Sequence, residues 1–263
     1  MRIELGIWPV RVEAEKLGEA LARRLGGELI RPWRDFGSAG EPSQKALFQE
    51  QFGQRSQWVL VMATGIAARF IDGMLRDKHA DPAVVVLDEA GRHAIALVGG
   101  HEGGANALAY RVANAVGAIP VVTTATEAVK PLVVGIGCRK GVSEEQVERA
   151  VRYALGQGGA GTAADDWAGI REIVTVDLKA EEPGLVAFCQ RHGIPMRVIS
   201  KQQIEARPWV SKPSEWVRQS VGLDGVCEPC ALIASARGRL VVPKTTLDGV
   251  AVAIVADEWE LGS

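Results

Sequence analysis

The sequence predicts an α/β protein of two domains, each a parallel or mixed sheet covered by helices. Apolar runs of strand length alternate with helical patterns along the chain, which is typical of sheets covered by helices. The length of 263 residues suggests about two domains at roughly 150 residues each. The alternation restarts after Glu127, so we place the domains at 1–129 and 130–263.

The apolar pattern of the first domain predicts strands over 3–8, 58–63, 84–87, 93–98 and 119–122, and helices over 11–25, 66–76 and 106–116. Residues 88–92 are typical of a hairpin turn, so one of the two strands around them runs antiparallel. The strands before and after the helix over 106–116 should run parallel, which puts residues 99–104 and 123–126 at one edge of the sheet. The sequence leaves open whether Thr64 and Gly65 share that edge.

The second domain repeats the alternation, with strands expected over 132–136, 173–177, 196–199, 240–242 and 250–255. Helices are expected over 143–155, 183–191, 214–221 and 229–234. Ser143 and Gln146 fit a capping box, in which both side chains bind the first amides of the helix.

Composition and charge exclude several classes of protein. A net charge of -2 with 24% charged residues provides no global basic field, so we expect no nucleic-acid partner. The apolar runs are far shorter than the ~20 residues of a membrane-spanning helix, and the N-terminus lacks a signal-peptide pattern. We therefore expect a cytoplasmic protein with no membrane partner. The 4 cysteines are scattered, which favours reduced thiols over disulfides.

The most informative segment is the loop over 99–106, in which glycines at 99, 100, 103 and 104 surround His101, one of 4 histidines in the chain. Glycines at this density let a substrate approach the main chain closely. The loop lies between a predicted strand and a predicted helix, so its N–H groups are expected to be exposed at the helix start. Two interpretations of His101 stand: a residue of a functional loop, or a turn residue that hydrogen-bonds the neighbouring backbone.

Four cations, Arg139, Lys140, Lys179 and Lys244, each follow a predicted strand. If those strand ends converge, the four side chains form one basic patch that suits a ligand with several acid arms. The alternative is that each is an ordinary solvated loop residue.

Cys227 and Cys230 form a Cys-x-x-Cys motif without a second pair, which by spacing can bind zinc or cycle as a dithiol. Pro229 suits a first helical turn, so we favour two buried or capping thiols and expect no metal site. Motifs of triad hydrolases, P-loop nucleotide hydrolases and zincins are absent from the sequence.

Several segments occur in an order and spacing that is more specific than any one glycine loop. They are Gly-Gly-His-Glu-Gly-Gly-Ala-Asn at 99–106, Thr-Thr-Ala-Thr at 123–126, Gly-Ile-Gly-Cys-Arg-Lys-Gly at 135–141, Asp-Leu-Lys-Ala at 177–180, Glu-Pro-Gly-Leu at 182–185, Pro-Ser at 213–214 and Val-Pro-Lys at 242–244. Over roughly residues 57–255 the chain resembles the CbiG-type cobalt-precorrin-5A hydrolases of anaerobic cobalamin (vitamin B12) biosynthesis.

The resemblance implies a hydrolase acting on a carbon-carbon bond, which opens the δ-lactone of cobalt-precorrin-5A and releases acetaldehyde to give cobalt-precorrin-5B. This reaction needs a base for water and a stabiliser for the oxyanion. We hypothesise that His101 is the base, because an imidazole exchanges protons near neutral pH, and that N–H groups of Gly103 and Gly104 hold the oxyanion. The substrate-binding candidates are Thr64, Gly65, Asn106, Thr123, Thr124, Thr126, Arg139, Lys140, Lys179 and Lys244.

The expected partner is the cobalt-containing tetrapyrrole substrate, which carries its own metal, so we expect no cofactor of the protein's own. We expect the substrate to lie in a cleft between the domains. A homo-oligomer and a contact with neighbouring pathway enzymes are left open.

Two alternatives belong to other functional classes. A non-catalytic corrinoid-binding or carrier protein is the first. Family members often have an extra segment between the two halves, whereas here Thr126 leads almost directly into the second domain. A cysteine-based redox or metal-binding protein is the second.

Overall fold

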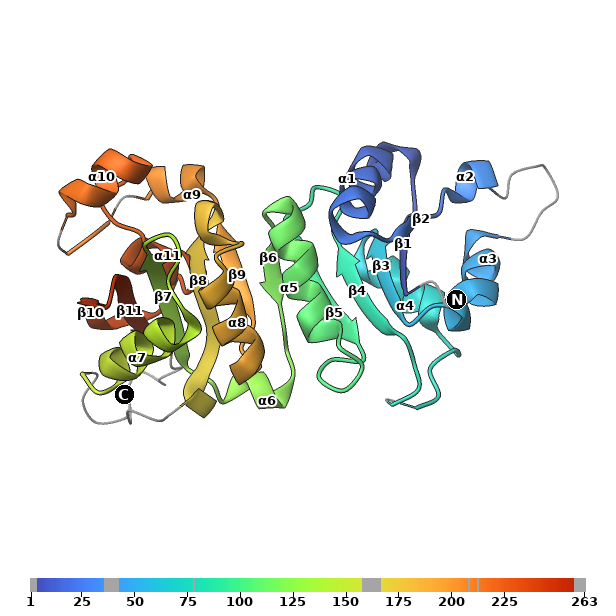
Figure 1. The fold of residues 1–263 in the computed structure, drawn as a ribbon. Coiled ribbons are helices and arrows are strands. Elements are labelled where there is room, and N and C mark those ends of the chain that lie inside the picture. Colours follow the sequence, from blue (N-terminus) through green and yellow to red (C-terminus); the bar gives the residue numbers. More distant parts are fainter. Residues whose placement is uncertain are drawn as a thin grey trace. The chain divides into compact units, whose positions relative to one another are not determined.

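Two structural units divide the chain, Met1–Thr124 and Ala125–Ser263. The computed structural model describes residues 4–35, 43–77, 79–157, 167–207, 209–211 and 213–257. Each unit contains a mixed sheet covered by helices, which confirms the predicted fold class (Figure 1). The second unit begins with the short helix α6 (Ala125–Ala128), and the expected boundary after residue 129 lies in the loop that follows it.

The first sheet has six strands in the order β2-β1-β3-β4-β5-β6. Their bounds are Leu5–Pro9 (β1), Glu28–Leu29 (β2), Gln57–Val61 (β3), Ala83–Leu87 (β4), His93–Val98 (β5) and Ile119–Val121 (β6). Neighbouring strands are parallel except β4 and β5, which pair antiparallel across the predicted hairpin turn. Strand β5 is therefore reversed relative to β1, β3 and β4, and β6 runs with β5, as the crossover rule predicts.

Helices cover both faces of this sheet because apolar residues alternate along its central strands. Val59 and Val61 face α1 and α5, whereas Trp58 and Leu60 face α3 and α4. The helices are η1 (Val12–Ala14), α1 (Glu15–Leu25), α2 (Pro32–Asp35), α3 (Gln44–Gln51), η2 (Phe52–Gln54), α4 (Thr64–Ile71) and α5 (Ala105–Val116). A three-layer arrangement results, with the sheet in the middle (Figure 1).

The reversal of β5 decides which loops meet. Val98 at the end of β5 pairs with Val84 near the start of β4, so the loop over 99–104 lies where β3 and β4 begin and β5 and β6 end. We call this the glycine-loop edge; it comprises residues 52–57, 76–77, 79–83, 99–104 and 122–124. Thr64 follows the end of β3 and so lies at the opposite end of the strands. The five residues of β3, at about 3.3 Å per residue, separate it from the glycine-loop edge.

The second sheet has five strands in the order β10-β11-β7-β8-β9. Their bounds are Leu132–Cys138 (β7), Ile170–Val176 (β8), Met196–Ile199 (β9), Arg239–Leu247 (β10) and Val250–Ala256 (β11). Strands β7, β8 and β9 are parallel, and β11 pairs antiparallel with both β7 and β10. Strand β10 is longer than the predicted segment over 240–242 and forms one edge of the sheet.

Helices also cover both faces of the second sheet. Ile136 and Ile173 pack on the side of α7 and α8, and Val133 and Val174 pack on the side of α11. The helices are α7 (Glu144–Leu155), η3 (Trp167–Gly169), η4 (Asp177–Lys179), α8 (Pro183–His192), α9 (Lys201–Glu205), α10 (Glu215–Val221) and α11 (Cys227–Ala234). The capping box predicted at the start of α7 is present. None of the helices in the described part of the chain has the length and apolar character needed to cross a membrane.

Candidate functional site

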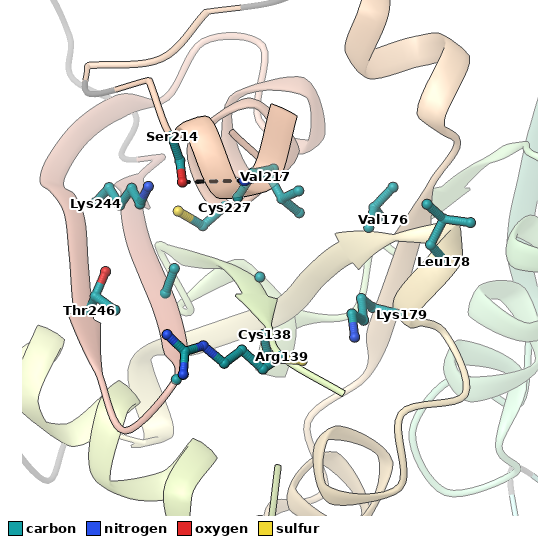
Figure 2. Close-up of a pocket in the computed structure, with 14 residues that line it drawn as sticks. Cys138, Arg139, Val176, Leu178, Lys179, Ser214, Val217, Cys227, Lys244 and Thr246 are labelled. Atoms are coloured by element: carbon teal, nitrogen blue, oxygen red, sulfur yellow. Dashed lines mark hydrogen bonds between the residues drawn. The ribbon is translucent and has the colours of Figure 1, made fainter. Parts of the chain in front are cut away.

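A cavity of about 220 Å³ opens in the second unit, at the ends of β7 and β8 (Figure 2). Its walls come from the end of β7, the β8–η4 turn, the β10–β11 hairpin and the segment around α10 and the start of α11. The lining residues are Gly137, Cys138, Arg139, Val176, Leu178, Lys179, Ser214, Val217, Val226, Cys227, Lys244, Thr246, Gly249 and Ala251. The site is therefore assembled from segments that are far apart in the sequence.

Three of the four predicted cations line this cavity. Figure 2 shows Arg139, Lys179 and Lys244 on three sides of a largely apolar interior that includes Val176 and Val217. Arg139 and Lys179 follow the ends of the parallel strands β7 and β8, as the sequence predicts. Lys244 does not follow a strand, because it lies within β10. Lys140 is exposed and is not among the lining residues.

Arg139 and Lys179 are each held by neighbouring groups, Arg139 by the backbone of the hairpin and Lys179 by a carboxylate. The Arg139 N–H donates to the carbonyl of Gly249 at 3.0 Å, and a Cβ on Gly249 would stand 3.3 Å from Arg139 Cδ, so the arginine stem packs on the hairpin turn. Lys179 Nζ lies 3.3 Å from Glu182 Oε2, and Glu182 also accepts the Gly141 N–H. The β7 turn and the η4 turn are thus joined through one buried carboxylate.

Glu228 is a structural residue that the sequence reasoning missed. It is 1% exposed, and its carboxylate accepts hydrogen bonds from the N–H groups of Ser211 at 2.7 Å and Lys244 at 2.9 Å. The Ser211 hydroxyl donates to the same carboxylate. Glu228 therefore ties α11 to β10 and to the segment that leads to Ser214. The sequence signal for this role is a glutamate among apolar residues at the start of α11, because a buried carboxylate needs hydrogen-bond partners.

Burial keeps the thiols at this site protonated. It raises the pKa of Cys138 to about 11 and that of Cys227 to about 12. The pKa of Cys230 also lies well above its ordinary value for the same reason. All four cysteines are free, as the sequence predicts, and all four are buried, which the sequence predicts only for Cys227 and Cys230. Within the described residues, no three His, Cys, Asp or Glu side chains are placed to share a metal ion.

The loop over 99–104 in the first unit is a tight strand-to-helix turn. Gly99 and Gly104 adopt φ angles of 72° and 83°, a region that disfavours residues with a Cβ. Asn106 Nδ2 donates to Thr124 Oγ1 at 3.0 Å, which joins the start of α5 to the segment after β6. Among the described residues, the N–H groups of Gly103 and Gly104 make no hydrogen bond. Two amide donors therefore stand unused at the start of α5.

The other predicted residues of the first unit are placed differently. His101 is exposed, makes no hydrogen bond within the described residues, and lines neither the cavity above nor the groove described next. Thr123 and Thr126 are exposed. Thr64 and Gly65 lie at the opposite ends of the strands from His101, so these residues do not form one site with the glycine loop. The expected cleft between the domains stays a prediction.

A polar groove of about 850 Å³ lies at the glycine-loop edge. It is lined by Gln49, Phe52, Gly53, Arg55, Ser56, Gly73, Met74, Arg76, His79, Ala80, Asp81, Pro82, Glu102 and Gly103. His79 Nδ1 lies 2.8 Å from Glu102 Oε2 across it. From the sequence, Glu102 is recognised only as a member of the glycine loop, and His79 is not recognised at all.

Comparison with known proteins decides the family. Residues 46–127 match the family described as Cobalamin synthesis G N-terminal, and residues 132–255 match Cobalamin synthesis G C-terminus. The chain belongs to the cobalamin synthesis G (CbiG) family. The first match ends inside α6 and the second begins after it, so the two halves of the family correspond, within three residues, to the two units of this CbiG protein.

Three relatives of this CbiG-family chain differ in how much they share with it. The cobalt-precorrin-5A hydrolase of Salmonella typhimurium is 48% identical over 79 residues, which cover 30% of this chain and only 22% of that protein. The cobalt-precorrin-5A hydrolase of Priestia megaterium is 21% identical over 310 residues, covering 81% of each chain. Protein CobE of a Sinorhizobium species is 30% identical over 132 residues, covering 50% of this chain and 82% of CobE.

Proposed function

We propose that this protein hydrolyses cobalt-precorrin-5A, opening its δ-lactone and releasing acetaldehyde to give cobalt-precorrin-5B. In this assignment it is a hydrolase acting on a carbon-carbon bond, and cobalt enters with the substrate. Membership of the CbiG family, with both family halves matched, supports the proposal. So do the names of two relatives.

The observation that carries the proposal is the ring of Arg139, Lys179 and Lys244 around a small apolar cavity. Arginine binds a carboxylate through two parallel hydrogen bonds, and lysine attracts it as a point charge. Drug-sized ligands occupy about 300–1,000 Å³, so a cavity of about 220 Å³ suits one acid side arm and not a whole macrocycle. We assign this cavity to a carboxylate arm of the substrate, with its methylene stem on Val176 and Val217.

The lactone chemistry is assigned to the glycine-loop edge. Addition of water to the lactone carbonyl creates an oxyanion. The N–H groups of Gly103 and Gly104, which have no hydrogen bond within the described part of the chain, can stabilise it. The bond from Asn106 to Thr124 fixes the start of α5 beside these donors. Thr123 and Thr126 remain candidates for contacts with substrate acid arms. His101 is the candidate for the base that the sequence suggests.

Anaerobic incubation of the full chain with cobalt-precorrin-5A tests the proposal. Acetaldehyde is measured by its reduction with alcohol dehydrogenase and NADH. We expect about one acetaldehyde per corrinoid consumed, and none from boiled protein. Tight binding of the corrinoid without acetaldehyde would contradict the proposal and support the carrier alternative.

A further inference from the structure

The groove at the glycine-loop edge contains a histidine-carboxylate pair that the function described so far does not use. His79 precedes β4 and Glu102 follows β5, so the antiparallel pairing of these two strands brings them together. The distance from His79 Nδ1 to Glu102 Oε2 is 2.8 Å. The two side chains are 63% and 42% exposed, which leaves the pair open to a ligand in the groove.

The backbone around His79 is held by short hydrogen bonds. The His79 N–H donates to Asp77 Oδ1 at 2.9 Å, and Asp81 Oδ2 accepts the N–H groups of Arg76 and Asp77 at 2.8 and 3.1 Å. These bonds define the turn that presents the imidazole to the groove. A base on such a turn is better oriented than one on an unsupported loop.

The contacts of the imidazole suit it to accept a proton. A carboxylate that binds Nδ1–H orients the ring and leaves Nε2 as the acceptor, which is the arrangement found in catalytic triads. Nε2 of His79 makes no hydrogen bond within the described residues. His101 has no comparable partner in the same part of the structure, so nothing there fixes its ring.

We propose that His79, oriented by Glu102, is the general base of the lactone hydrolysis. This inference rests on the proposed function. In the step, a water O–H bond breaks and its proton passes to His79 Nε2, while the water oxygen bonds to the lactone carbonyl carbon. The acyl C–O bond then breaks and leaves an alkoxide, whose C–O bond becomes the carbonyl of acetaldehyde as its C–C bond to the macrocycle breaks. The macrocycle keeps the electron pair of that bond, and the imidazolium loses its proton to solvent.

The surroundings of the pair agree with an acidic substrate. Gly103, whose N–H is unused, lines the same groove. Arg76 also lines it, and among the described residues its guanidinium has no ion-pair partner. Arg55 is 5% exposed and is paired with Glu28. The groove of about 850 Å³ thus combines a base, an amide donor and a cation.

Variants of His79 and Glu102 test the inference. His79→Ala should lower kcat by about 100-fold or more, and leave the corrinoid dissociation constant within a few-fold, because a general base acts in the transition state. Added imidazole should restore part of the activity. Glu102→Gln should lower kcat by about 10-fold, and Glu102→Asp should show a smaller loss. In the His79→Ala background, Glu102→Gln should have no further effect on kcat, because Glu102 acts through His79.

His93 provides a matched control. It is an exposed imidazole beside a carboxylate, with Nδ1 3.8 Å from Asp88 Oδ1, but it lies at the opposite edge of the same sheet. His93→Ala should leave kcat unchanged, and circular dichroism should show that the variants are folded.

The outcomes separate the two proposals. A wild-type protein that releases no acetaldehyde contradicts the proposed function, and the inference with it. An active wild type with an equally active His79→Ala variant contradicts the inference alone. A 100-fold loss in His101→Ala with none in His79→Ala also overturns it and assigns the base to His101.

Discussion

Gly135 lies directly against the carbonyl group of Cys227. A Cβ on Gly135 would stand 1.9 Å from that oxygen, and a Cβ on Gly137 would stand 3.2 Å from Val226 Cβ. Helix α11 therefore begins in contact with the backbone of β7. This close approach places Val226 and Cys227 in the wall of the cavity and gives a physical reason for Gly135 and Gly137.

Gly135→Ala should destabilise the second unit. The added methyl meets backbone atoms, which move less readily than a flexible side chain, so we expect a loss of about 1–3 kcal/mol in the free energy of unfolding. Urea unfolding measures it. Gly65→Ala is the control, because its Cβ would meet nothing within 4 Å in helix α4, and it should stabilise by up to about 1 kcal/mol. Equal urea midpoints for the two variants would contradict the close approach of Gly135 to the Cys227 carbonyl.

Arg139→Gln and Lys244→Gln should each raise KM by about 3–10-fold while kcat changes little, since the cations contact a substrate arm remote from the reacting bond. The increase should shrink at high salt, because exposed charges are screened. Lys140→Gln is the matched control, as Lys140 adjoins Arg139 but does not line the cavity. A similar rise in KM for all three variants would contradict the assignment of the cavity to a carboxylate arm of the substrate.

Sequence reasoning anticipated the parts of the site that follow from parallel pairing. Arg139 and Lys179 follow neighbouring parallel strands, whose ends must lie at one edge. The sequence predicts Lys244 after a strand because Pro243 interrupts the apolar pattern of β10. This proline is tolerated because β10 is an edge strand, and the pairing with β11 is irregular between Val242 and Thr245.

The pair of His79 and Glu102 could not be predicted in the same way. Its formation depends on β5 being the reversed strand of the hairpin, which the apolar pattern leaves open. The same reversal separates Thr64 from the glycine loop. Residues 76–82 also carry no periodic pattern, so nothing in the sequence pointed to His79.

Thr124→Val should remove the hydrogen bond from Asn106 and cost about 1 kcal/mol of stability in the first unit. It should also lower kcat, because the start of α5 and its amide donors lose an anchor. Thr124→Ser keeps the hydroxyl and should retain both properties. Urea unfolding and the acetaldehyde assay give the comparison. Loss of activity in the serine variant would show that the threonine methyl, and not the hydroxyl, matters.

The buried thiols make stability depend on pH in the alkaline range. Their ordinary pKa is 9.0, whereas burial raises the pKa to about 11 for Cys138 and about 12 for Cys227. Between these values the unfolded chain loses protons that the folded chain keeps, so the thiols' contribution to stability is complete below about pH 9 and declines above it. Above about pH 9, the unfolding temperature should decline less in the double variant Cys138→Ala, Cys227→Ala than in the wild type. The same pH dependence in both proteins would contradict the raised pKa values of these thiols.

Single-turnover hydrolysis of cobalt-precorrin-5A in H₂¹⁸O tests most directly whether this protein opens the lactone by adding water to its carbonyl carbon. We expect one ¹⁸O atom in the new carboxylate of the corrinoid product and about one acetaldehyde released per corrinoid. Recovery of the substrate unchanged from its complex with the protein, or a product whose carboxylates carry no label, would contradict the assignment.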